Sequence, residues 1–146
     1  MDTRFKFRLE KVLDIKIQRE NEHMISHSKI LNEKVKVENE IRNLESQYDK
    51  YSELQYSESD TLKKKIAYNY MNSLFQTIQS YKEKLKEIEQ EYIKSREKLI
   101  SLQSERKSLE RLKEKQYQKF LEVLEEEENA SNDEFSIQAY FRNSEN

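Results

Sequence analysis

Glu20, His23 and His27 are the residues best suited to chemistry in this chain, because they lie at positions i, i+3 and i+7 of one segment. On a helix, this spacing places a carboxylate and two imidazoles on one face, as a metal site would need. The segment lacks the glutamate that follows the first histidine of a zinc-protease helix. The chain has only these two histidines and no cysteine to complete a site. We therefore expect no metal site, and histidines that are solvated or lie at the edge of a helix-helix seam.

Catalysis is not expected either. The chain has 29 acidic residues, so pairs of carboxylates occur throughout and single out no site. Catalytic carboxylates need a cavity that removes water and shifts their pKa, and a pair of helices provides none. The complete absence of glycine excludes a loop that could cradle a phosphate. We expect a protein that is not an enzyme and requires no cofactor.

Composition favours paired helices. The chain lacks glycine and proline, the residues that sheets and α/β domains use in turns and bulges. With 38% charged and 34% hydrophobic residues, it can fill a narrow seam between helices but no wide core. The net charge of −2 comes from interspersed signs, which predicts no attraction to nucleic acid or anionic lipid. Apolar runs are too short for a membrane span, and residues 1–8 lack the apolar core of a signal peptide, so a cytoplasmic protein is expected.

A seven-residue repeat runs through the second half of the chain. Spacings of four and three alternate without a slip through Ala67, Met71, Leu74, Ile78, Tyr81, Leu85, Ile88, Tyr92, Ser95, Leu99, Leu102, Arg106 and Leu109. This pattern predicts a left-handed coiled coil against a partner helix. In the first half, the apolar stripe has two phases that differ by about one residue. The first phase contains Leu9, Leu13, Ile17, Met24 and Leu31, and the second contains Val37, Ile41, Leu44, Tyr48 and Tyr51. Such a shift indicates a stutter in the coiled coil.

The small polar cluster at residues 57–61 predicts a reversal of the chain, with a second helix that begins near Thr61. Leu44 would then face the turn Met71–Leu74, Met24 would face Tyr92, and Leu13 would lie near Leu102. One continuous helix remains an alternative, as does a parallel dimer, because apolar seam positions serve both arrangements equally well.

The end of the chain is expected to extend beyond the hairpin. Past about residue 113, the second helix would overhang and expose Tyr117, Phe120, Leu121 and Leu124. A break is predicted at residues 129–133, with Ser131 and Glu134 spaced as a capping box. The sequence thus predicts an all-α fold, with an antiparallel coiled-coil hairpin of two long helices over residues 1–128. Residues 129–146 would form a flexible or short-helical tail.

Three stretches, in this order, resemble the flagellar export protein FliJ family. They are the opening Phe-Lys-Phe-Arg-Leu-Glu-Lys-Val-Leu-Asp-Ile-Lys at residues 5–16, Tyr-Met-Asn-Ser-Leu-Phe-Gln-Thr-Ile at 70–78, and Asp-Glu-Phe-Ser-Ile-Gln-Ala-Tyr-Phe at 133–141. The resemblance covers essentially the whole chain. It implies a coiled coil like the central stalk of rotary ATPases, in the flagellar type III export apparatus.

The resemblance also implies partners. These are the export ATPase hexamer, the cytoplasmic domain of the export gate, and export chaperones, with the protein held at the cytoplasmic face of the inner membrane through them. Carried over by position, the gate-binding residues would be Tyr70, Leu74, Thr77 and Tyr81. ATPase contact would involve Phe7, Leu9, Leu13, Tyr117, Phe120 and Leu124. The alternatives are the equivalent stalk protein of a virulence-type secretion system and a generic coiled-coil scaffold or dimerisation module.

Overall fold

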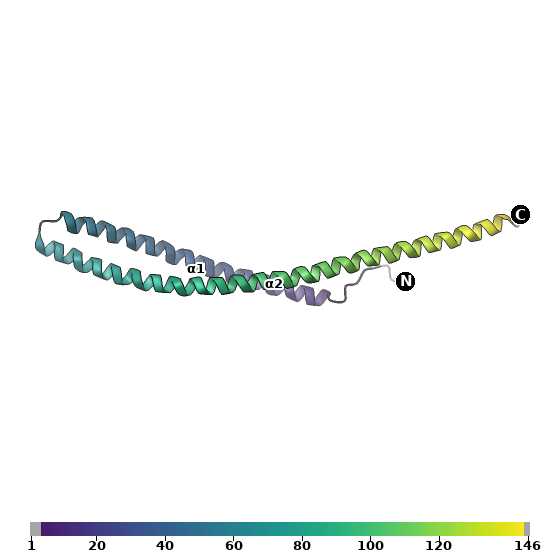
Figure 1. Ribbon diagram of the computed structural model, residues 1–146, viewed down its shortest axis with the longest axis horizontal. Coiled ribbons are helices and arrows are strands. Elements are labelled where there is room, and N and C mark those ends of the chain that lie inside the picture. The colour runs from purple at the N-terminus through teal and green to yellow at the C-terminus, as the bar shows by residue number, and fades with distance from the viewer. Residues whose placement is uncertain (1–3, 145–146) are drawn as a thin grey trace. The chain divides into compact units, whose positions relative to one another are not determined.

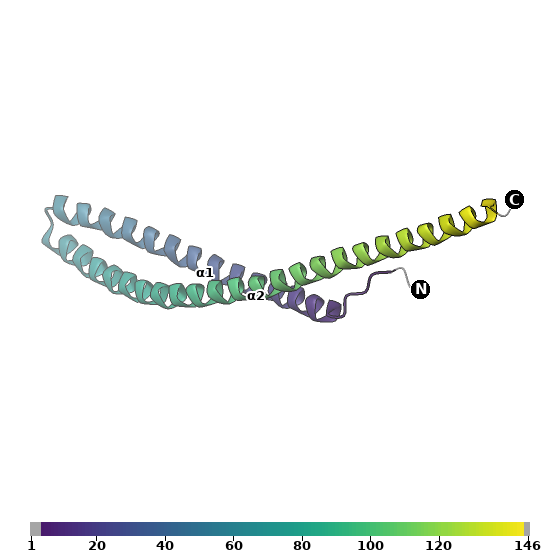
Figure 2. The ribbon, with the colours of Figure 1, turned by 45° about the vertical axis from the view of Figure 1, so that its right-hand side comes forward.

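Two long helices joined by a short turn make up the fold (Figure 1). The computed structural model describes residues 4–144. Helix α1 spans Glu10–Ser57 and helix α2 spans Thr61–Ser144. No strand occurs among the described residues, and the two helices run antiparallel away from the turn (Figure 2). The fold is all-α, as the sequence predicted.

Contacts within the chain define two compact units, which are described separately below. The first unit contains residues 20–101, with the turn and the adjoining parts of both helices. The second contains residues 1–19 and 102–146, of which 4–19 and 102–144 are described.

The turn between the helices lies where the small polar cluster predicted it. The Asp60 carboxylate accepts a hydrogen bond from the Leu62 amide at 3.0 Å, so Asp60 is the N-cap of α2. At the other side of the turn, the Glu58 amide donates to the Leu54 carbonyl at 3.0 Å. No described residue has a positive φ angle. The chain therefore reverses without the left-handed backbone that would have required glycine.

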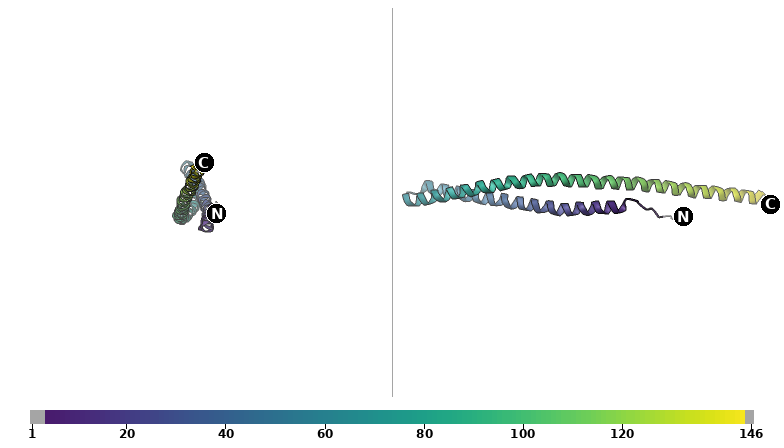
Figure 3. Two further views of the ribbon diagram at one scale, coloured as in Figure 1. Left: turned by 90° about the vertical axis from the view of Figure 1, so that its right-hand side faces the viewer. Right: turned by 90° about the horizontal axis from the view of Figure 1, so that it is seen from below.

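The core of the first unit is a seam between α1 and α2, which lie side by side there (Figure 3). Near the turn, Leu44 packs with Leu74 and Ile78, as the predicted pairing of Leu44 with the Met71–Leu74 turn requires. Farther along, the seam contains a second cluster of Val37, Ile41 and Ile88.

The seven-residue repeat in α2 is confirmed. Every position of the repeat from Ala67 to Leu109 is buried or half-buried, including the polar Ser95 and Arg106. The residues between them are almost all exposed. The repeat therefore marks the face of α2 that packs against the rest of the chain.

The stutter predicted for α1 is wrong. Met24 and Leu31, which carried the first phase, are 45% and 40% exposed. An unbroken alternation of three and four instead joins buried or half-buried positions along α1, with further half-buried residues such as Ile17 beside it: Leu13, Lys16, Glu20, His23, His27, Ile30, Lys34, Val37, Ile41, Leu44, Tyr48 and Tyr51. The apolar pattern was misleading because five of the six seam positions from Lys16 to Lys34 carry polar or charged side chains, Ile30 being the exception. The predicted pairing of Met24 with Tyr92 is wrong for the same reason, since Tyr92 stacks on His27.

The helix break predicted at residues 129–133 is also wrong, because α2 runs unbroken to Ser144. This segment contains no glycine or proline. Its serine, asparagine and aspartate each disfavour a helix by only about 0.7 kcal/mol or less, which does not force a break. Ser131 and Glu134 therefore lie inside a helix and form no capping box. The division of the chain into a hairpin at residues 1–128 and a separate tail at residues 129–146 stays a prediction.

Candidate functional site

The predicted Glu20, His23 and His27 face lies in the seam of the first unit, where it meets Ser95 of α2. His23 Nε2 lies 2.7 Å from the Ser95 carbonyl oxygen, so this nitrogen carries the proton and donates. The Ser95 hydroxyl lies 2.9 Å from His27 Nδ1 and 3.3 Å from His23 Nε2. The His27 ring also stacks on Tyr92, with centroids 4.9 Å apart. Both histidines thus join the two helices.

These contacts assign the histidines to helix packing. Within residues 4–144, no three histidine, aspartate or glutamate side chains converge as a metal site would require. Glu20 is only 6% exposed, and Lys34 lies over the Tyr92 ring with its ammonium 4.9 Å from the centroid. The sequence interpretation of histidines at the edge of a seam therefore agrees with the observed geometry.

The four residues proposed for the gate surface divide into two pairs. Leu74 is buried in the seam, and Tyr81 is half-buried against both core clusters. Tyr70 and Thr77 are exposed, and the Tyr70 ring packs on Tyr51 of α1 with centroids 4.5 Å apart. Tyr70 and Thr77 offer most of the side-chain surface available to a partner, while Leu74 and Tyr81 hold that part of α2 against α1.

The residues proposed for ATPase contact come together in the second unit. Phe7 and Leu13 are 8% and 4% exposed, and Leu9, Phe120 and Leu124 are half-buried. The Phe5 ring contacts both Tyr117 and Phe120, with centroid distances of 5.3 and 5.6 Å. The segment before α1 therefore extends beyond the start of α1, away from the turn, and lies beside α2 (Figure 1). Tyr117 and Leu121 are exposed, as the sequence predicted for the overhang. Phe120 and Leu124 are half-buried instead, and Phe5 of the segment before α1 packs on Phe120, a contact that the length of α1 did not reveal.

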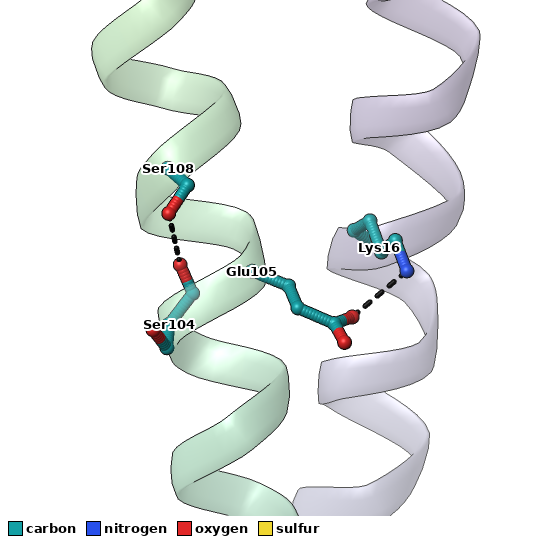
Figure 4. A network of polar contacts seen from close by, with 4 residues as sticks. All are labelled: Lys16, Ser104, Glu105 and Ser108. Atoms are coloured by element: carbon teal, nitrogen blue, oxygen red, sulfur yellow. Dashed lines mark hydrogen bonds and ion pairs between the residues drawn. The ribbon is translucent and has the colours of Figure 1, made fainter.

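Two ion pairs also join α1 and α2 in this unit. Lys113 Nζ lies 2.8 Å from Glu10 Oε2, and Lys16 Nζ lies 2.8 Å from Glu105 Oε2 (Figure 4). One turn past Glu105, the Ser108 hydroxyl donates to the Ser104 carbonyl within α2. The hydrogen bond from Lys16 and its positive charge lower the pKa of Glu105 below the usual value of 4.5.

We expect Lys16→Met to raise the pKa of Glu105 towards 4.5, as measured by an NMR titration of the Glu105 carboxyl carbon. Because this pKa is lower in the folded chain, the pair favours folding above the unfolded-state pKa. That contribution is lost as the pH falls through the folded-state pKa, and it is small because the pair is exposed. Lys107→Met is the control, since Lys107 lies outside the pair. An unchanged Glu105 pKa in Lys16→Met would contradict the assignment.

The comparison with known families decides the identity. The model of the family described as flagellar FliJ protein matches residues 5–145 of the 146. The chain belongs to the FliJ family. No curated protein and no solved structure matches it.

Membership of the FliJ family makes this chain a coiled-coil component related to flagellar protein export. The family is a non-enzymatic one, associated with the proteins of the export apparatus. Neither helix, over the residues described, combines the length and the apolar character that crossing a membrane requires. The FliJ match includes both helices and the segment before α1, so the features described above all lie within it.

Sequence reasoning missed an apolar hollow beside the FliJ-like segment at residues 70–78. Side chains of both helices, including Tyr51, Leu54, Ile66 and Tyr70, line a hollow of about 360 Å³ near the turn. Leu54 and Ile66 lie off the seam and are exposed. Their apolar character next to the small polar turn was the available clue, but only the paired helices bring them together.

Proposed function

We propose that this protein is a non-catalytic component of the flagellar type III export apparatus that binds the export ATPase ring as a stalk-like coiled coil. It would also contact the export gate and export chaperones. The observation that carries the proposal is the FliJ family match over residues 5–145, which spans both helices. An antiparallel helix pair held by one narrow seam also suits insertion into a ring.

The ATPase would contact the second unit. Tyr117 and Leu124 have accessible side-chain surface, whereas Phe7 and Leu13 are buried. We infer that Phe7, Leu9 and Leu13 shape this surface, and that Tyr117, Phe120 and Leu124 supply the atoms that meet the ATPase. Aromatic side chains that are partly packed already lose little conformational entropy when a partner binds.

The gate would contact the first unit near the turn. Tyr70 and Thr77 are exposed on α2, and Leu74 and Tyr81 support them from the seam. The hollow lined by Tyr51, Leu54, Ile66 and Tyr70 adjoins this surface and could take an apolar side chain of the gate. The protein would then lie at the cytoplasmic face of the inner membrane, held there by its protein partners.

A binding experiment with two variants tests the proposal. The purified export ATPase and the purified cytoplasmic domain of the export gate from the same organism are each titrated with the full chain. We expect Tyr117→Ala with Leu124→Ala to weaken ATPase binding about tenfold and leave gate binding unchanged. We expect Tyr70→Ala with Thr77→Ala to do the opposite.

Each double variant serves as the matched control of the other, since both remove two side chains from α2 outside its deeply buried core. Thermal unfolding checks that both variants keep the fold. Failure of the unaltered chain to bind either partner would contradict the function, and equal losses with both variants would contradict the division into two surfaces.

A further inference from the structure

The seam changes character along α1. From Val37 to the turn, its deeply buried positions are apolar. From residue 20 to residue 34, four of its five positions carry polar or charged side chains, namely Glu20, His23, His27 and Lys34. Together with Tyr92 and Ser95 of α2, these four residues are called the polar layer below. All of them lie in the unit of residues 20–101.

The contacts of His23, His27 and Lys34 in the polar layer join different residue types on opposite helices. His23 donates to the Ser95 carbonyl, and His27 shares a hydrogen bond with the Ser95 hydroxyl. The aromatic ring of Tyr92 stacks on His27, and the Lys34 ammonium also lies over this ring. Among the described residues, every fully buried side-chain nitrogen or oxygen atom has a hydrogen-bond partner. The antiparallel pairing thus satisfies this polar stretch.

A parallel pair of chains in register would not satisfy it. In that arrangement every seam residue faces its own copy, so Glu20 would face Glu20 and Lys34 would face Lys34. Like charges in a seam are costly, and His23 would lose the Ser95 carbonyl. The apolar part of the seam, such as Val37 and Ile41, would pack comparably in either arrangement. Among the seam positions of residues 20–101, the polar layer therefore distinguishes the two arrangements.

We propose that the polar layer selects the antiparallel orientation and register of α1 and α2, and rejects the parallel two-chain coiled coil that the same apolar repeat would allow. This inference does not depend on the proposed export function. Polar seam residues commonly specify orientation at some expense of stability, so an apolar version of this layer should be more stable and less specific.

The absence of cysteine from the chain permits a direct test. Ile30→Cys places one thiol in the seam between His27 and Lys34. In a parallel dimer two such thiols meet, and oxidation links the chains, whereas in the antiparallel arrangement they do not meet. The reporter is introduced into the full-length protein and into a variant with Glu20, His23, His27, Lys34 and Ser95 all replaced by leucine. Linked chains are quantified on non-reducing gels, and mass is measured by light scattering.

We expect the reporter alone to give almost no linked chains, and the apolar variant to give about tenfold more, with a higher thermal unfolding temperature. The matched control carries five leucines at exposed positions instead, Asn21, Ser26, Ser28, Lys29 and Ser101. The proposal requires this control to give as few linked chains as the Ile30→Cys reporter alone.

Three results would overturn the proposal. The first is a reporter that links chains efficiently with the polar layer intact. The second is an apolar variant that stays unlinked, and the third is equal linking in the leucine control. An antiparallel dimer formed by exchange of helices keeps the polar contacts. The double variant Ile30→Cys with Ile88→Cys recognises this dimer, because its disulfide then joins two chains and not two positions of one chain. Such a dimer would support the proposed antiparallel orientation.

Discussion

Replacement of Ile88 by alanine is expected to lower the free energy of unfolding by about 2–4 kcal/mol, the loss typical of a buried aliphatic side chain and the cavity it leaves. Ile88 is 4% exposed and packs with Val37 and Ile41 in the seam. Because a helix pair has few buried side chains, each of them contributes a large part of the free energy of unfolding. Chemical denaturation followed by circular dichroism measures the change.

Ile93→Ala is the matched control for this prediction. Ile93 lies five residues farther along the same helix and is 55% exposed, so its truncation should change the free energy of unfolding by less than about 0.5 kcal/mol. If Ile88→Ala and Ile93→Ala lowered the free energy of unfolding by similar amounts, the repeat from Ala67 to Leu109 would not form the seam.

Ser131→Pro is expected to unfold the last part of α2. Proline removes a backbone hydrogen bond and clashes with the preceding turn, at a cost of about 3 kcal/mol inside a helix. Residues 131–144 lie at the end of this helix and have largely exposed side chains, so little packing resists the loss. We expect the helical signal in circular dichroism to fall by about a tenth, with no change in the cooperative unfolding of the hairpin.

Ser131→Ala isolates the effect of backbone geometry at the same position, because alanine favours a helix more than serine does. It should keep or slightly raise the helical signal. If Ser131→Pro leaves the signal of the unaltered chain intact, α2 does not continue through residues 129–133, and the break predicted from the sequence would be right after all.

Several features of the fold followed from local patterns. The repeat in α2 was predictable because most of its positions carry large apolar side chains between charged neighbours, as at Ile78 and Ile88. The turn was predictable because Asp60 is a strong N-cap at the only small polar cluster in that part of the chain. Both features depend on a few neighbouring residues.

The candidate surfaces were predictable only in part. Family resemblance named Tyr70, Leu74, Thr77 and Tyr81, but it could not tell which of them face solvent. The contact of Phe5 with Tyr117 and Phe120 joins residues more than a hundred positions apart. No periodicity reports such a contact, because the segment before α1 is not helical.

By itself, the sequence determined that this protein is helical, where its chain would reverse, and which face of α2 is buried; that the chain does reverse there, in place of one continuous helix, was decided by the structure. The sequence determined these features because capping and apolar periodicity are local properties. The tertiary structure alone decided the phase of α1, since His23, His27 and Lys34 qualify as seam residues only once Ser95 and Tyr92 lie opposite them. A polar side chain becomes acceptable in a seam through its partner, and the partner is set by the pairing of helices.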